Sequence, residues 1–170
     1  MAKTRNKRSP VSAVCSALGT ILLVAVILMC IPVTLPRAFG YEVYTVISGS
    51  MEPAIPTGSM VFVKGMEAAE VEEEDVIAFY GGPDSNAIIT HRVVENRVVM
   101  GEFVTKGDAN EDVDMNPVNY QEFLGRVDLS IPVLGTLAQM LTTTTGKIGA
   151  VSAIVAAILC HVLAAVFERK

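Results

Sequence analysis

The chain has little cysteine, and its polar middle has none. Its three cysteines, Cys15, Cys30 and Cys160, all lie in two apolar stretches near the ends of the 170-residue sequence. This excludes both a disulfide framework and zinc-type ligand spacing in the middle of the chain, so packing is the role expected of these thiols. Internal repeats and low-complexity linkers are also absent, which favours a single small domain there.

Positive charge is scarce between residues 38 and 146. This region holds five basic residues and 17 of the 18 acidic residues, so its formal charge is −12, whereas the whole chain carries −5. Contacts to phosphate groups need lysine and arginine. The composition therefore excludes nucleic acid as a partner.

Long uncharged stretches are present at both ends of the chain. Val11 to Val33 and Ile148 to Phe167 contain no charged residue, and roughly 20 apolar residues suffice to cross about 30 Å of hydrocarbon. We expect two transmembrane helices, a basic N-terminus over residues 1–10 and a short tail over 168–170. The flanking basic residues are Lys3, Arg5, Lys7, Arg8, Arg169 and Lys170. Because positive flanks stay in the cytoplasm, both termini should be cytoplasmic and residues 38–146 extracytoplasmic.

The first stretch has some features of a cleavable signal peptide. It exceeds the usual apolar core of about 7–15 residues, however, and no small-x-small cleavage site closes it. Ile31 to Arg37 follows instead, with two prolines. We expect an uncleaved signal anchor.

The middle of the chain has the pattern of a β domain. Short β-branched or aromatic runs are separated by Gly and Pro breakers, which predicts a mainly β fold: a small antiparallel β sandwich or barrel-like domain between two transmembrane helices. A tight hairpin turn is expected at Glu95-Asn96, and residues 67–74 fit either one helical turn or an acidic loop. The predicted strands are 41–46, 60–64, 76–80, 87–94, 97–105 and 123–129.

Ser50 lies in a turn just after the first apolar stretch. Gly49 permits close backbone approach, and Pro53 and Pro56 restrict the chain that follows. A serine hydroxyl becomes a nucleophile only if a neighbouring base takes its proton. The Ser50 N–H and the Ser48 hydroxyl are candidate donors to an oxyanion. An ordinary solvated turn is the alternative.

His91 is the candidate base. It is the only histidine outside the apolar stretches, and in a strand it shares a face with Ile89 and Val93. Histidine ordinarily titrates near neutral pH, which suits proton transfer. The alternative is a hydrogen-bonded histidine of the core or surface.

An Asp-rich segment follows, from Thr105 to Asp114. A Ser-His pair needs a carboxylate on the far imidazole nitrogen, and Asp108, Asp112 and Asp114 each qualify. Calcium is a further possibility for such a loop, but the Gly and terminal Glu of an EF-hand are missing. A solvated acidic loop is the remaining alternative.

Together these segments resemble a known family. Ser-Gly-Ser-Met-Glu-Pro at 48–53, Thr-His-Arg-Val-Val at 90–94 and Thr-Lys-Gly-Asp-Ala-Asn at 105–110, with Asp114 six residues after Asp108, resemble type I signal peptidase. The resemblance spans roughly residues 40–130. It is specific to the branch of the endoplasmic reticulum, archaea and sporulating Gram-positive bacteria, in which histidine replaces a lysine base.

The resemblance implies a membrane-anchored serine endopeptidase that removes signal peptides from exported precursors without a cofactor. Ser50 would be the nucleophile, His91 the general base and Asp114 the catalytic aspartate, with Asp108 in a supporting role and Ser48 at the oxyanion hole. The precursor would bind extended along a strand edge, with small residues before the scissile bond. Its implied partners are signal peptides, the lipid bilayer and the secretion translocon.

Some positions depart from the family pattern or stay open. Gly58-Ser59 and Glu74-Asp75 stand where the family often has Gly-Asp, and Glu111 and Asp112 add negative charge beside Asp114. Met51, like Ile55, fits either contact with substrate and lipid or simple core packing. Two other functions remain: a catalytically silent scaffold of the same fold, and a self-cleaving repressor, which the two anchors and the lack of a DNA-binding motif disfavour.

The charge distribution yields a topology prediction. A reporter fused after Lys170 should show the activity of a cytoplasmic protein, because Arg169 and Lys170 resist translocation. The same reporter inserted at Pro83 should behave as extracytoplasmic. A translocated C-terminus would mean that Ile148 to Phe167 does not span the membrane.

Overall fold

The computed structural model describes residues 10–82 and 85–168 and divides into two compact units. One unit combines the chain up to Pro32 with the chain from Met140 onward, and the other runs from Val33 to Gln139. The basic residues at positions 3–8 and 169–170, on which the predicted topology depends, lie outside the described residues.

Two helices dominate the first unit. Helix α1 (Pro10–Ala38) and helix α3 (Thr144–Glu168) are each long and apolar enough to cross a membrane, and a helix satisfies its backbone polar groups internally, as a lipid environment requires. Both include the stretches predicted to span. The three cysteines lie in these helices.

Small and polar residues join the two helices. The Ser12 hydroxyl donates to the Ala164 carbonyl over 3.0 Å. At Gly19 a Cβ atom would lie 2.9 Å from the His161 ring, so the missing side chain makes room for the imidazole. Close approach through small residues is typical of helix packing in membranes.

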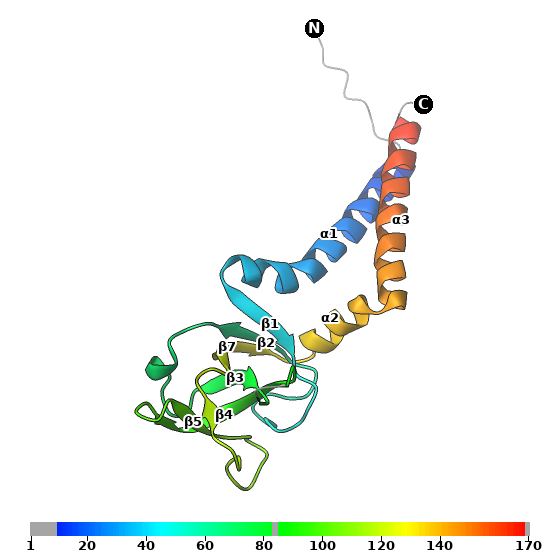
Figure 1. The fold of residues 1–170 in the computed structure, drawn as a ribbon. Helices are drawn as coiled ribbons and strands as arrows, with labels where there is room; N and C mark the ends of the chain where they lie inside the picture. Colours follow the sequence, from blue (N-terminus) through cyan, green and yellow to red (C-terminus); the bar gives the residue numbers. More distant parts are fainter. Residues whose placement is uncertain (1–9, 83–84, 169–170) are drawn as a thin grey trace. The chain divides into compact units, whose positions relative to one another are not determined.

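The second unit is built on one antiparallel sheet (Figure 1). Its strands are β1 (Tyr41–Thr45), β2 (Met60–Lys64), β3 (Val76–Tyr80), β4 (Ile88–Arg97), β5 (Glu102–Lys106), β6 (Val118–Asn119) and β7 (Phe123–Ile131). They pair in the order β1-β2-β7-β3-β4-β5-β6. Register shifts leave an extra residue twice in β7 and once in β4, which bends these strands, and the sheet curls like part of a barrel. The predicted mainly β, antiparallel fold between two helices is confirmed, as one curled sheet.

The predicted hairpin exists, but its turn was placed wrongly. Glu95 and Asn96 lie inside β4, and the chain reverses over residues 98–101. The Asn96 amide donates to the carbonyls of Ala68 and Val71 at 3.1 and 2.8 Å, which keeps this asparagine in the sheet. Gly101, at φ +69°, takes the left-handed conformation that the turn needs instead.

Helical segments complete the unit. A short 3-10 helix, η1 (Ala68–Glu70), lies within the 67–74 segment, in agreement with the helical-turn alternative. Helix α2 (Leu134–Thr142) follows β7 and was not predicted. Its Thr136 N–H donates to the Gly58 carbonyl over 3.0 Å, so the helix begins against the chain that enters β2.

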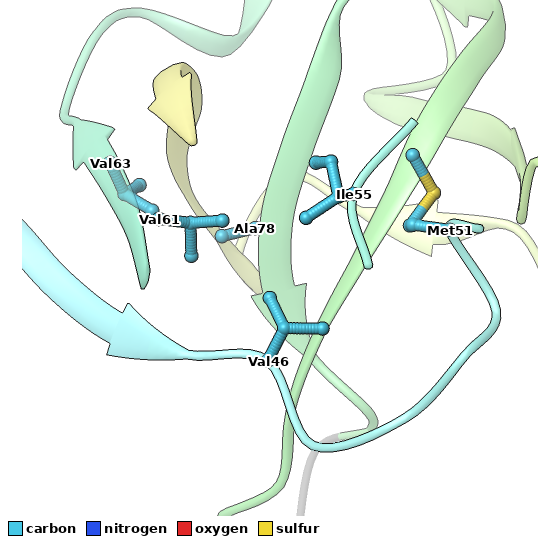
Figure 2. Close-up of a cluster of buried hydrophobic side chains, with 6 residues drawn as sticks. All are labelled: Val46, Met51, Ile55, Val61, Val63 and Ala78. Atoms are coloured by element: carbon cyan, nitrogen blue, oxygen red, sulfur yellow. The ribbon is translucent and has the colours of Figure 1, made fainter. Parts of the chain in front are cut away.

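Two core clusters lie on opposite faces of the sheet. The first core cluster comprises Val46, Met51, Ile55, Val61, Val63 and Ala78 (Figure 2). The second core cluster comprises Val71, Ile77, Phe79, Val93, Phe103 and Val118. Successive side chains of β3 alternate between the clusters, as the period of a strand requires.

Met51 belongs to the first core cluster and has no exposed surface. Of the two alternatives for Met51, core packing is therefore confirmed and contact with lipid is excluded, and the same holds for Ile55, which is 5% exposed. The exposed apolar residue of the turn that holds Ser50 (residues 47–50, the serine turn) is Ile47, which is 79% exposed.

Truncating Met51 should destabilise the β domain. Met51→Ala removes a fully buried side chain, which typically costs about 2–5 kcal/mol. Met100→Ala is the matched control, because Met100 is 71% exposed. Thermal unfolding of the full chain in detergent should show a lower midpoint for Met51→Ala alone. Equal midpoints would contradict the burial of Met51.

Candidate functional site

A histidine and a carboxylate meet beside the second core cluster. His91 lies in β4, directly opposite Ile77 of β3, and its ring packs edge-on against Phe79 with centroids 6.1 Å apart. Its Nδ1 lies 2.5 Å from an Asp114 carboxylate oxygen. The side chains of His91 and Asp114 are only 10% and 24% exposed, so the pair is largely shielded from water.

Thr105 holds the carboxylate in place. Its hydroxyl donates to the same Asp114 oxygen over 2.6 Å, and the Asp114 N–H donates to the Thr105 carbonyl over 2.8 Å. A carboxylate that accepts a hydrogen bond from Nδ1–H leaves Nε2 as the basic nitrogen of a neutral imidazole. No hydrogen bond to Nε2 forms within residues 10–82 and 85–168. This arrangement can accept a proton at Nε2.

Asp108 pairs with Arg92, the residue after His91. Arg92 Nε and an Nη atom donate to the two carboxylate oxygens at 2.8 and 2.7 Å, and the other Nη donates to the Glu74 carbonyl over 2.7 Å. Hydrogen bonding to Asp108 raises the pKa of Arg92 above its ordinary value. A bidentate pair of this kind fixes geometry as well as charge, so Asp108 secures its loop to β4.

The serine turn is attached to the same loop. The Ala109 N–H donates to the Ser50 carbonyl over 2.9 Å. Gly107 makes this approach possible, because a Cβ atom there would lie 2.6 Å from the Ser50 carbonyl oxygen. The turn thus connects to β4 through Ala109, Asp108 and Arg92.

Ser50 and His91 are not hydrogen-bonded in this structure. The Ser50 hydroxyl has one hydrogen-bond partner in the described part of the chain, the Ser48 hydroxyl at 3.5 Å. The structure therefore brings His91 together with Asp114, and Ser50 together with Ser48. The two pairs are linked through the Ala109–Ser50 backbone hydrogen bond and the Asp108–Arg92 ion pair, and no hydrogen bond joins Ser50 to His91 in the described part of the chain.

The other candidates occupy different positions. Asp112 is exposed and contacts neither His91 nor Arg92 within the described residues. The Lys106 ammonium donates to the Glu111 carbonyl over 2.9 Å, and that of Lys64 lies 5.9 Å from the Tyr41 ring centroid. No cluster of three or more His, Cys, Asp or Glu side chains suited to a metal occurs among the described residues.

The departures from the family pattern have local explanations. Glu74 has φ +72°, the left-handed region that favours glycine, and its carbonyl accepts from Arg92. The Ser59 hydroxyl donates to the Pro56 carbonyl over 2.6 Å.

The sequence assigned no role to Thr105 or Arg92, although both lie in the motifs quoted above. Their contacts with Asp114 and Asp108 depend on the pairing of β4 with β5.

A pocket of about 440 Å³ opens beside the His91–Asp114 pair. Its walls come from the end of β3, from Ile89 and His91 of β4, from residues 114–118 and from Glu122. None of residues 47–51 lines it. The pocket thus lies on the imidazole side of the site.

Comparison with known proteins gives a family match. A family model described as signal peptidase, peptidase S26, matches residues 18–109. The match includes Ser50, His91 and Asp108 and ends before Asp114.

Curated relatives agree with this match. Signal peptidase I W of Bacillus subtilis (strain 168) is 42% identical over 88 residues, which is 49% of this chain and 45% of the relative. The signal peptidase complex catalytic subunit SEC11 of Colletotrichum graminicola is 34% identical over 90 residues, 51% of this chain and 52% of the relative. The SEC11 subunit of Fusarium vanettenii is 32% identical over 91 residues, which is 51% of this chain and 52% of the relative. The chain spans about half the length of these relatives.

Proposed function

This chain belongs to the signal peptidase family, peptidase S26, and on that basis we propose that it is a membrane-anchored serine endopeptidase that cleaves N-terminal signal peptides from exported precursor proteins. The observation that supports this most is the partly buried contact of 2.5 Å between His91 and Asp114, in a domain where a turn serine is tied to the histidine strand.

In the proposed reaction, Ser50 attacks the scissile carbonyl. His91 Nε2 takes the hydroxyl proton, and Asp114 holds the imidazole in the required tautomer and stabilises its protonated form. The acyl group of the signal peptide is transferred to Ser50, and His91 returns the proton to the departing amine. Water then hydrolyses the acyl-enzyme with His91 again as the base.

This reaction requires a hydrogen bond from Ser50 to His91 when substrate is bound. Catalytic hydrogen bonds often tighten only in the substrate complex, and the Ser50 hydroxyl is held by nothing stronger than a 3.5 Å contact with Ser48. The Ser48 hydroxyl and the Ser50 N–H are the proposed donors to the oxyanion. Asp108 supports the site through Arg92.

The proposed location follows from the two apolar helices and the charge pattern. Helices α1 and α3 would span the membrane, with both termini cytoplasmic and the β domain extracytoplasmic. A precursor whose signal peptide lies in the bilayer would then present its cleavage site at the membrane surface. Proposed partners are the signal peptide, the lipid bilayer and the translocon that delivers precursors.

The proposed base can be tested directly. His91→Ala should lower cleavage of a synthetic precursor at least about 10³-fold, as loss of a triad member does, whereas Lys64→Ala and Lys106→Ala should retain most activity. Ser50→Ala should abolish both cleavage and labelling by a fluorophosphonate. Mass spectrometry of the products identifies the cleaved bond and measures the amount of product. Near-normal cleavage by His91→Ala would instead favour Lys64 or Lys106 as the base, and an unlabelled, inactive wild-type chain would favour the silent scaffold.

Asp114→Asn and Asp112→Asn form a matched pair. Asp114→Asn keeps the shape but removes the charge beside His91, so cleavage should fall by orders of magnitude. Asp112→Asn should have little effect on the cleavage rate. Asp108→Asn should lower the rate by less than Asp114→Asn and by more than Asp112→Asn, because it weakens the ion pair with Arg92. Resistance to limited proteolysis should confirm that each variant is folded. If a folded Asp112→Asn is the most sensitive, the carboxylate assignment is wrong.

A further inference from the structure

Glu122 places a carboxylate in the pocket next to the His91–Asp114 pair. Its backbone is fixed, because its N–H donates to the Asn119 carbonyl and its carbonyl accepts from the Tyr80 N–H, both over 2.9 Å. One carboxylate oxygen accepts a 3.3 Å hydrogen bond from the Asn119 N–H. Within the described residues, the other oxygen has no hydrogen-bond partner and no Lys or Arg forms an ion pair with this side chain.

The pocket continues beyond Glu122. A second pocket of about 430 Å³ shares Tyr80, Gly82 and Glu122 with the first, of about 440 Å³. The second is lined largely by polar side chains, including Asn86, Asn119 and Gln121. Each volume lies in the usual range of ligand pockets. The two pockets adjoin at their shared residues and are called the groove below, and the amide groups of the second suit the backbone of an extended peptide.

The charge of this groove has one sign. Asp114 and Glu122 line it, and none of the lining residues within 10–82 and 85–168 is Lys or Arg. Phe79, Ile89 and Val118 supply an apolar wall in the first pocket. This combination suits a long basic side chain, which packs its methylene stem on apolar surface while its charged end contacts a carboxylate.

The position of the groove indicates which part of a substrate enters it. In a Ser-His reaction the imidazole donates its proton to the leaving amine, so the leaving segment lies on the imidazole side. The groove is lined by His91, whose side chain is nine-tenths buried, and by no residue of the serine turn. In signal peptide cleavage the leaving segment is the start of the mature protein.

From these observations we infer that the groove binds the first residues of the mature chain and that Glu122 selects precursors with a basic residue there. This rests on the proposed function. Glu122 is thereby a specificity-determining residue on the product side of the site, separate from the surface that binds the signal peptide itself.

The test uses the full chain in detergent and three series of synthetic precursor peptides. One series varies the first position after the scissile bond, one the second and one the third. Within a series, the varied position is Lys, Ala or Glu. In at least one series the wild type should show a kcat/KM about tenfold higher for Lys than for Glu, because attraction replaces repulsion at a partly exposed carboxylate. This ratio should fall as salt is raised and screens the charges.

Glu122→Gln removes the charge but keeps an acceptor for the Asn119 N–H, so the Lys-to-Glu ratio should fall to about one. Glu70→Gln is the control, because Glu70 lies in η1 and outside the groove, and it should keep the wild-type ratio. The charge reversal Glu122→Lys should favour the Glu peptides, a result that misfolding cannot produce.

The outcomes separate two failures. Cleavage by the wild type with no preference in any series, or a preference that Glu122→Gln leaves intact, overturns the role of Glu122 and leaves the proposed function standing. If the wild type cleaves none of the peptides, like Ser50→Ala, the proposed function fails and the selection by Glu122 fails with it.

Discussion

Burial of the residues on both sides of Ser50 is the constraint on which the site depends. Val46 precedes the serine turn and Met51 and Ile55 follow it, and all three belong to the first core cluster (Figure 2). Apolar side chains leave such a core only at a cost of several kcal/mol. The exposed residues 47–49 therefore lie between two buried anchors, which gives this short segment a defined position.

The second requirement is to relate this turn to His91, which packs against Phe79 of the second core cluster. The connection is polar. The Ala109 N–H donates a hydrogen bond to the Ser50 carbonyl, and Asp108 forms a bidentate ion pair with Arg92, the residue after His91. Charge-assisted bidentate contacts have little tolerance in angle. Hydrophobic packing thus fixes where the turn is, whereas hydrogen bonding fixes how it faces the histidine strand. Asp114 completes the arrangement from the same loop.

The sequence was sufficient for the strands whose pattern is local, and it singled out Ser50 and His91 as the candidate nucleophile and base. It failed where a distant contact decided the outcome. Asn96 has the composition of a turn, yet its amide bonds to residues 68 and 71 keep it in β4. The carboxylate partner of His91 was open among three aspartates, because spacing along a loop does not determine which side chain points inward; the Thr105 hydrogen bond selects Asp114. Met51 was equally undecided, since burial depends on the whole sheet.

The strand order has a consequence for the timing of assembly. Strand β7 lies between β2 and β3, so the chain made before it consists of β1–β2 and β3–β6, two pieces that share no strand. Ser50 belongs to the first piece and His91 and Asp114 to the second. All three side chains precede Phe123–Ile131 in the order of synthesis, Asp114 by nine residues. Before this strand is made, no strand pairing joins the piece that carries Ser50 to the piece that carries His91 and Asp114, so the last strand of the sheet to be synthesised is the one that makes the two pieces a single sheet.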